Sequence, residues 1–269
     1  AAQPYTPGGG EVVVFRRVSG VWTTVTTLKG SNTEAFDDFG TTVVVGDDGA
    51  SIIVGAPLED GALPGGADNS VSDAGAVYVF TRDAADAWSE VAYLKAAQPR
   101  AGALFGQSMA GSGDGSTLAV GGPLANPLIG AASEVQIFER TAPNTWAHAE
   151  RLSPPQDLAQ DEFGLYSIAM SADGTALAVS SHRESGDGTG LSGFVAGAST
   201  SQSGAVHVYR RTSAGGWSAP RYLKAPNNQP GLLFGFALAF TADGGALGAR
   251  SSAAAIAASS ASRPEGCLP

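Results

Sequence analysis

Acidic residues are the side chains of this sequence with the clearest capacity for chemistry, and they gather in stretches between apolar runs. Converging carboxylates can hold a cation, contact a partner or, as a pair facing each other across a cleft, cleave glycosides. The candidates are Asp37 and Asp38, then Glu59, Asp60, Asp68 and Asp73, then Asp161 and Glu162, and finally Glu184 and Asp187. Which of these roles applies depends on the elements that position them.

The serines and histidines form no catalytic pattern. Ser108 and Ser167 lie outside the Gly-x-Ser-x-Gly setting of a hydrolase nucleophile. His148, His182 and His207 lack the spacing of metal ligands. His207 alternates with valines in an apolar run, which predicts that its side chain faces outward. We therefore predict no catalytic residue, no metal site and no cofactor, and a protein that is not an enzyme.

Composition narrows the class of protein. The chain has 269 residues, 37 of them glycine, and a formal net charge of −10. This acidity argues against nucleic acid as a partner, because such binding needs clustered lysine and arginine. No segment is long and apolar enough for membrane insertion. The single cysteine, Cys267, rules out a disulfide within the chain.

A repeat organises the sequence. Phe-Gly pairs begin at Phe39, Phe105, Phe163 and Phe234, at steps of 66, 58 and 71 residues (105−39, 163−105, 234−163). Units of this size bury their apolar faces by stacking on copies of themselves. The repeated residues are therefore committed to packing, and function is expected on the loops between them.

Each unit predicts four strands, which we name A to D. Strand A follows Phe-Gly, an Asp-Gly turn leads into strand B, and alternating apolar residues mark strand C. The predicted A strands are 41–45, 107–111, 165–170 and 236–240, and the predicted C strands are 11–15, 76–80, 134–138 and 205–209. Strand D carries the tryptophans of the chain: Trp22, Trp88, Trp146 and Trp217. The recurring phenylalanines and tryptophans are predicted to pack in the core.

At this point the chain resembles the FG-GAP repeat family of integrin α subunits and of bacterial and algal secreted proteins. Residues 39–94 match best, with Phe39-Gly40, Val54-Gly55-Ala56-Pro57, Gly75 to Phe80 and Trp88. The resemblance implies an all-β propeller of four-stranded antiparallel blades with strand A innermost. It also implies an extracellular or cell-surface location. Calcium, which such propellers often hold in the A–B loop, is not expected, because these loops carry one acid or two adjacent ones.

About four blade-equivalents are present. We expect a half blade at 10–30, blades at 36–97, 103–155 and 161–225, a half blade at 232–249, and a low-complexity tail at 250–269. Three arrangements remain open: a closed four-blade ring, a part of a longer and usually seven-bladed propeller, or a ring completed by two chains. We favour the partial ring, because the sequence begins in the middle of a blade.

The B–C and D–A loops of a propeller emerge on one face, so the acidic stretches above are predicted to share it. They form either a binding surface or solvated connectors, and the sequence favours neither. The first functional hypothesis is a structural or adhesion module that binds protein. The second is glycan binding through Phe194, Tyr166 and Phe36. A hydrolase or lyase is the third, and it requires titratable groups that converge on one pocket.

Overall fold

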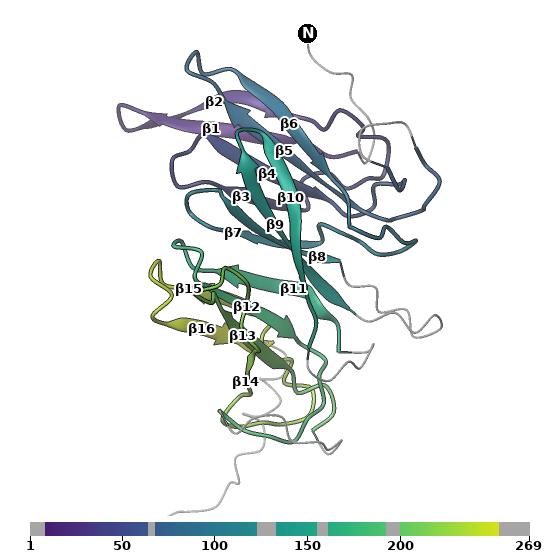
Figure 1. The fold of residues 1–269 in the computed structure, drawn as a ribbon, viewed down its shortest axis with the longest axis vertical. Helices are drawn as coiled ribbons and strands as arrows, with labels where there is room; N and C mark the ends of the chain where they lie inside the picture. Colours follow the sequence, from purple (N-terminus) through teal and green to yellow (C-terminus); the bar gives the residue numbers. More distant parts are fainter. Residues whose placement is uncertain (1–8, 64–67, 123–132, 155–160, 192–199, 253–269) are drawn as a thin grey trace, which may run out of the picture.

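The computed structural model describes residues 9–63, 68–122, 133–154, 161–191 and 200–252, and these are all strand, turn and loop. Sixteen strands form three four-stranded and two two-stranded antiparallel sheets (Figure 1). The predicted all-β class and four-stranded blades are confirmed. No helix in this part of the chain is long and apolar enough to cross a membrane.

The strands follow the predicted repeat. The first pair is β1 (Val12–Val18) and β2 (Val21–Leu28). Blade 1 consists of β3 (Thr42–Val45), β4 (Ser51–Ala56), β5 (Ala76–Arg82) and β6 (Trp88–Leu94). Blade 2 consists of β7 (Ser108–Gly111), β8 (Thr117–Gly122), β9 (Glu134–Ala142) and β10 (Thr145–Leu152).

Blade 3 consists of β11 (Phe163–Met170), β12 (Ala176–Ser181), β13 (Ala205–Arg210) and β14 (Arg221–Leu223). The last pair is β15 (Ala237–Phe240) and β16 (Leu247–Arg250). Within each blade the order is A-B-C-D, so each strand pairs with its neighbours in sequence.

The Asp-Gly turns between strands A and B form as predicted. In blade 1, Gly49 has a φ of 62°, and Asp48 Oδ1 accepts a hydrogen bond of 2.8 Å from the backbone N–H of Ala50. The same aspartate contact recurs in the other three copies, at 2.9, 3.0 and 2.9 Å. Aspartate closes the turn through its side chain, and glycine supplies the left-handed backbone.

The blades meet along strand A, as predicted. Strand β3 lies beside β7, β7 beside β11, and β11 beside β15. Thr42 Oγ1 donates a hydrogen bond of 2.7 Å to the carbonyl of Gly106 in the next blade, and Ser108 does the same to Gly164. A side chain at Gly55 could not fit, because its Cβ would lie 2.2 Å from the Gly106 oxygen. This close approach accounts for the glycine of the Phe-Gly pair and for the one that ends strand B.

The core prediction holds for the first three phenylalanines and only partly for the tryptophans. Phe39, Phe105 and Phe163 are at most 2% exposed. Trp217 is buried and Trp88 and Trp146 are half-buried, as their repeat positions predict. Trp22, however, is 68% exposed, and here the prediction is wrong. Its sheet, β1–β2, has only strands C and D, so the strands that would cover the ring are missing.

The prediction for His207 is also wrong. The residue alternates with valines on β13, but its side chain is 3% exposed. Strand C lies inside a four-stranded sheet, and His207 and its neighbour Val206 on the opposite face are both buried. The alternation of side chains along this strand therefore does not distinguish a buried face from a solvent-exposed one. It does so only in a sheet that has one face exposed to solvent.

The first and last strand pairs remain separate sheets (Figure 1). The β1–β2 pair lies at one end of the stack, and β15–β16 packs on blade 3. The single-chain closed ring of four blades is therefore not formed.

Candidate functional site

Blades 1 and 3 bury the same trio of charged residues at the end where the B–C and D–A loops emerge, which we call the loop face. Aligned on the repeat, the trios are Asp37, Glu59 and Lys95 in blade 1, and Asp161, Glu184 and Lys224 in blade 3. All six side chains are between 1% and 6% exposed. Four of the predicted site residues thus belong to two copies of one buried arrangement, which we call the acid–lysine cluster.

In blade 1 the cluster centres on Glu59. Its carboxylate accepts hydrogen bonds from Asn32 Nδ2 at 2.6 Å, Tyr78 OH at 2.7 Å and Tyr93 OH at 3.3 Å. Its backbone carbonyl accepts the N–H of Gly75 at 2.9 Å. These contacts join the D–A connection, strand C, strand D and the B–C loop, so Glu59 fixes the whole loop end of the blade.

Asp37 lies against Glu59 in this cluster. Burial raises the pKa of Asp37 to about 7, and the charge of Glu59 acts in the same direction, whereas a hydrogen bond from the backbone N–H of Glu34 opposes the rise. Lys95 Nζ donates to the Asp60 carbonyl at 3.1 Å, and burial lowers the pKa of this lysine. The proton that Asp37 retains up to about pH 7 therefore limits its repulsion with the carboxylate of Glu59.

In blade 3 the lysine meets the glutamate directly. Lys224 Nζ donates to Glu184 Oε2 and to Ser203 Oγ, both at 2.6 Å, and the backbone N–H of Gly186 donates to Glu184 Oε1 at 2.6 Å. Burial lowers the pKa of Lys224, and Glu184 opposes this shift. The pair is an ion pair enclosed by protein, and it fixes the start of the B–C loop.

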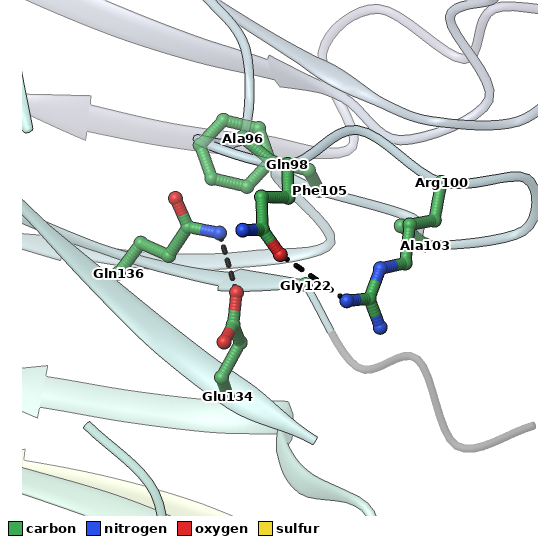
Figure 2. Close-up of a pocket in the computed structure, with 8 residues that line it drawn as sticks. All are labelled: Ala96, Gln98, Arg100, Ala103, Phe105, Gly122, Glu134 and Gln136. Carbon is green, nitrogen blue, oxygen red and sulfur yellow. Dashed lines mark hydrogen bonds between the residues drawn. The ribbon is translucent and has the colours of Figure 1, made fainter. Parts of the chain in front are cut away.

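Blade 2 lacks the trio. Ala103 occupies the aspartate position and Ser153 the lysine position, while the glutamate position lies outside the described residues. A cavity of about 30 Å³ lies there, lined by Ala103, Phe105 and Gln136 among others (Figure 2). Gln136 Nε2 donates to Glu134 Oε1 at 2.6 Å beside it. The cavity has room for water but not for an organic ligand.

The remaining acids of the first B–C loop shape its backbone. Asp68 accepts hydrogen bonds from the N–H groups of Ala62 and Leu63 at 2.9 and 3.1 Å, and hydrogen bonds led by that of Ser70 lower its pKa to about 2. Asp60 accepts the N–H of Asp73 at 2.7 Å. These three acids stabilise turns of the loop.

The third B–C loop uses its acids in a similar way. Asp187 Oδ1 accepts hydrogen bonds from the backbone N–H and the hydroxyl of Thr200, at 3.1 and 2.9 Å. Glu162, on the D–A connection, lies 2.8 Å from Arg183 and 3.1 Å from His182 Nε2. Burial lowers the pKa of His182 to about 4 and raises that of Glu162. Phe194 lies outside the described residues.

Phe36 is the most unusual exposed residue of the loop face. Its side chain is 73% exposed and its φ is 74°. The residues at the same distance before Phe105 and Phe234 are glycines, Gly102 and Gly231, both with a φ of 71°. An aromatic residue thus occupies a turn position that favours glycine. In the aligned sequence two copies have glycine at this position, whereas Phe36 and Gln160 occupy it in the other two.

Phe36 stands on a turn fixed from two sides. The next residue, Asp37, is buried in the acid–lysine cluster, and Asn69 of the B–C loop donates to Glu34 at 3.1 Å. Leu63 on that B–C loop is 65% exposed. Glu34 and Asp38 are also exposed. The surface therefore combines apolar side chains with carboxylates on an ordered backbone.

The chemistry open to these residues is limited by burial. Among the described residues, no three His, Cys, Asp or Glu side chains are grouped so as to hold a metal ion. The carboxyl groups of the two acid–lysine clusters are enclosed by tyrosine, asparagine, serine and lysine side chains. They stabilise loops in this arrangement and present no acid and base to a substrate.

Comparison with known sequences agrees with the repeat. Residues 22–80 are an FG-GAP repeat. The match covers strand D of the first pair and strands A to C of blade 1, and it includes Phe36, Asp37 and Glu59. No curated protein matches the chain.

Solved structures similar to this chain include β-propellers. The Cps50 (Swd1) β-propeller domain of Myceliophthora thermophila is 13% identical with a TM-score of 0.43, covering 78% of this chain and 47% of that one. The periplasmic gluconolactonase PpgL of Pseudomonas aeruginosa is 16% identical with a TM-score of 0.44, covering 91% and 74%. A functionally unknown protein of Desulfotomaculum acetoxidans is 13% identical with a TM-score of 0.37, covering 83% and 68%. The chain thus spans about half of the first of these.

Proposed function

We propose that this chain is a non-catalytic interaction module that binds a protein partner through the loop face of blade 1. The observation that carries the proposal is Phe36, an aromatic side chain displayed at a positive φ where two of the other three copies of the repeat have glycine. A non-glycine residue in this region costs on the order of 1–2 kcal/mol, and an exposed ring recovers little of this by burial. A binding role gives a reason for keeping it.

The chemistry of the surface indicates the kind of partner. Phe36 and Leu63 are apolar, while Glu34 and Asp38 on the same surface are acidic and exposed. A protein with an apolar pocket and a basic rim would complement both properties, with the aromatic ring as the anchor. Adhesion or assembly at the cell surface, in the extracellular location that the FG-GAP repeat suggests, is part of this proposal.

Site-specific photo-crosslinking tests it. A photoreactive amino acid at position 36 is expected to capture a discrete protein from the surface fraction of the source cells, and the same probe at Leu191, which is 77% exposed, is not. Binding of that protein should fall at least tenfold for Phe36→Gly and remain unchanged for Leu191→Ser, an exposed residue of another loop. Equal capture at both positions, or full binding by Phe36→Gly, would reject the proposal.

Glycan binding is a second candidate with its own observation. Tyr166 and Phe236 stack with ring centroids 5.9 Å apart and an interplanar angle of 29°, and they are 49% and 37% exposed. The Arg250 guanidinium lies 5.4 Å from the Phe236 centroid. Exposed aromatic faces beside a polar group suit a sugar ring. A glycan array that gives hits lost in Tyr166→Ala would favour this function, and an empty array would remove it.

A further inference from the structure

The β1–β2 pair exposes residues that complete blades bury. Phe15 is 57% exposed, whereas the residues at the same position of strand C are 3%, 4% and 2% exposed in Phe80, Phe138 and Tyr209. The alignment rests on structure as well as sequence, because the C–D ladder has a β-bulge just before Phe15, Phe80 and Phe138. The pair is therefore the outer half of a blade whose inner half is missing.

The missing half would lie in an apolar groove. A space of about 410 Å³ opens beside β1–β2, lined by Phe15, Trp22, Val25 and Val45 among others. Val45 is 56% exposed and Val25 is 37% exposed. An apolar surface of this kind, next to an unpaired strand edge, favours pairing with a further strand.

The last strand pair, β15–β16, lacks the complementary half of a blade. Strands β15 and β16 correspond to A and B, and within the described part of the chain β16 has no strand C beside it. A groove of about 690 Å³ lies between this pair and blade 3, lined by Leu247, Phe240 and Leu223 among others. The β15–β16 pair thus offers the inner half of a blade, and the β1–β2 pair offers the outer half.

We propose that β16 of one copy pairs with β1 of a second copy, so that the two half blades form one composite blade. Equivalent strands of complete blades define the register: Ile52 faces Phe80, Leu118 faces Phe138, and Leu177 faces Tyr209. In the composite blade Leu247 therefore faces Phe15 of the second copy, and Ala249 faces Val13. The pairing covers Phe15 and Trp22 and satisfies both strand edges.

A backbone contact beside the A–B turn is part of this register. In every complete blade, an arginine lies two residues after the aromatic residue of strand C. Its backbone N–H donates a hydrogen bond to the carbonyl of the residue that follows Asp-Gly. The three bonds are Arg82 to Ala50 at 2.9 Å, Arg140 to Ser116 at 2.8 Å, and Arg211 to Thr175 at 2.8 Å. The corresponding bond in the composite blade runs from Arg17 to Gly245 of the other copy.

A second copy is the occupant we choose because the two halves belong to one chain but lie in separate sheets within it. Each copy supplies three complete blades, and two joints supply two composite blades, which gives 3 + 3 + 2 = 8 blades. This number is within the usual range for propellers of four to eight blades. The contact is head-to-tail, and a ring of two copies closes it.

Disulfide trapping in the full 269-residue chain tests the register. With Cys267→Ser as background, Val13→Cys and Ala249→Cys are expected to form a covalent dimer under oxidising conditions. The control, Val14→Cys with Ala249→Cys, shifts the register by one residue, places the thiols on opposite faces, and should stay monomeric. A cross-linked monomer would show closure within one chain, and no cross-link would show no pairing; either result overturns the proposal.

Mass in solution gives an independent measurement. Light scattering of the unmodified chain should show twice the mass of one copy. Phe15→Asp should raise the dissociation constant at least tenfold, since it places a charge where an aromatic ring is buried. The side chain is exposed in a single copy, so the circular dichroism spectrum should not change. Leu63→Asp, at another exposed apolar residue, should leave the mass unchanged, and a monomeric parent chain would refute the proposal.

Discussion

Blades 1 and 3 differ from blade 2 at the loop face, although all three share strand order and register. The first and third blades bury an acid–lysine cluster, and the second has Ala103, Ser153 and a small cavity in its place. The Phe-Gly pair and the leucines of strand D are the same in all three. The repeat therefore determines the backbone, and the loop end of each blade tolerates either a buried polar network or small neutral side chains.

The two clusters also differ from each other. In blade 3 the charge of Glu184 is compensated by Lys224 at 2.6 Å. In blade 1 Glu59 is held by tyrosine and asparagine donors, while Lys95 donates to a backbone carbonyl. Substitutions at Lys224, His207 and Asp37 test the difference between the two blades. A substitution at Phe36 tests the turn next to the blade 1 cluster.

Removal of the blade 3 lysine should have the largest effect. Lys224→Met leaves the carboxylate of Glu184 buried without its cation, which typically costs about 3–5 kcal/mol in the free energy of unfolding. Denaturation in urea, monitored by circular dichroism, measures the loss.

The matched control is Lys95→Met in blade 1. Its loss should be smaller by at least about 1 kcal/mol, because Glu59 keeps its tyrosine and asparagine donors. Equal losses in the two variants would show that both lysines compensate their glutamates in the same way.

The histidine of blade 3 should produce the next largest effect, and only in acid. Burial lowers the pKa of His207 to about 4 from its ordinary value of 6.5, and the charge of Lys224 acts in the same direction. The unfolded chain thus binds a proton that the folded chain does not, so stability falls as the pH falls from 6.5 toward 4. His207→Phe should remove about 2–3 kcal/mol of this loss.

Phenylalanine suits the site because the imidazole packs edge-on against the rings of Phe163 and Tyr222, with centroids 5.4 and 5.5 Å away. Urea denaturation at a series of pH values gives the slope. Some acid dependence should remain, since the pKa of His182 is also lowered to about 4. An unchanged slope in His207→Phe would mean that His207 is protonated in the folded protein.

Much of the fold could be predicted because its signals are local and repeated. Asp-Gly turns, the glycine of each Phe-Gly pair and the alternating C strands all indicate the same four-strand unit, and the structure confirms them. The exposure of Trp22 and the burial of His207 could not be predicted from the repeat. The exposure of each side chain depends on which sheets pack against its strand. That packing depends on where along the chain a blade is left with two strands.

The residues of the candidate site could be predicted from the sequence, but their structural role could not. The sequence identifies the acidic stretches, but it places Glu59 and Glu184 on a possible binding surface, whereas both side chains are buried. Their partners, such as Tyr93 and Lys224, lie 34 and 40 residues further on, near the end of strand D. Only the register of four strands brings them together. The equivalence of the two clusters becomes clear once that register is known.

The blade 1 cluster should show the opposite pH dependence to that of His207. Because the pKa of Asp37 is raised to about 7 from 3.8, the folded chain keeps a proton that the unfolded chain loses. Its contribution is fully present below about pH 4 and is lost as the pH rises through 7. Asp37→Asn should remove this loss, so that at pH 8 the variant is more stable than the parent by about 1–2 kcal/mol after allowance for solvent screening.

The control for Asp37→Asn is Asp38→Asn, a change at the exposed neighbouring residue. Unfolding curves at pH 5 and pH 8 should differ between Asp37→Asn and the parent chain, but not between Asp38→Asn and the parent. A parent chain whose stability contribution from position 37 grows toward pH 8 would contradict the raised pKa of Asp37.

The smallest expected effect lies next to this cluster, at Phe36. Its φ of 74° matches that of Gly102 and Gly231, so Phe36→Gly should relieve backbone strain and stabilise the protein by about 1 kcal/mol. Phe36→Ala is the matched variant, since it removes the ring but keeps the strain, and it should bring little gain. The midpoint of urea unfolding measures both. Equal gains in stability for Phe36→Gly and Phe36→Ala would mean that the exposed ring, and not the backbone, destabilises the parent chain. The turn of blade 1 would then be no more strained than the turns that contain glycine.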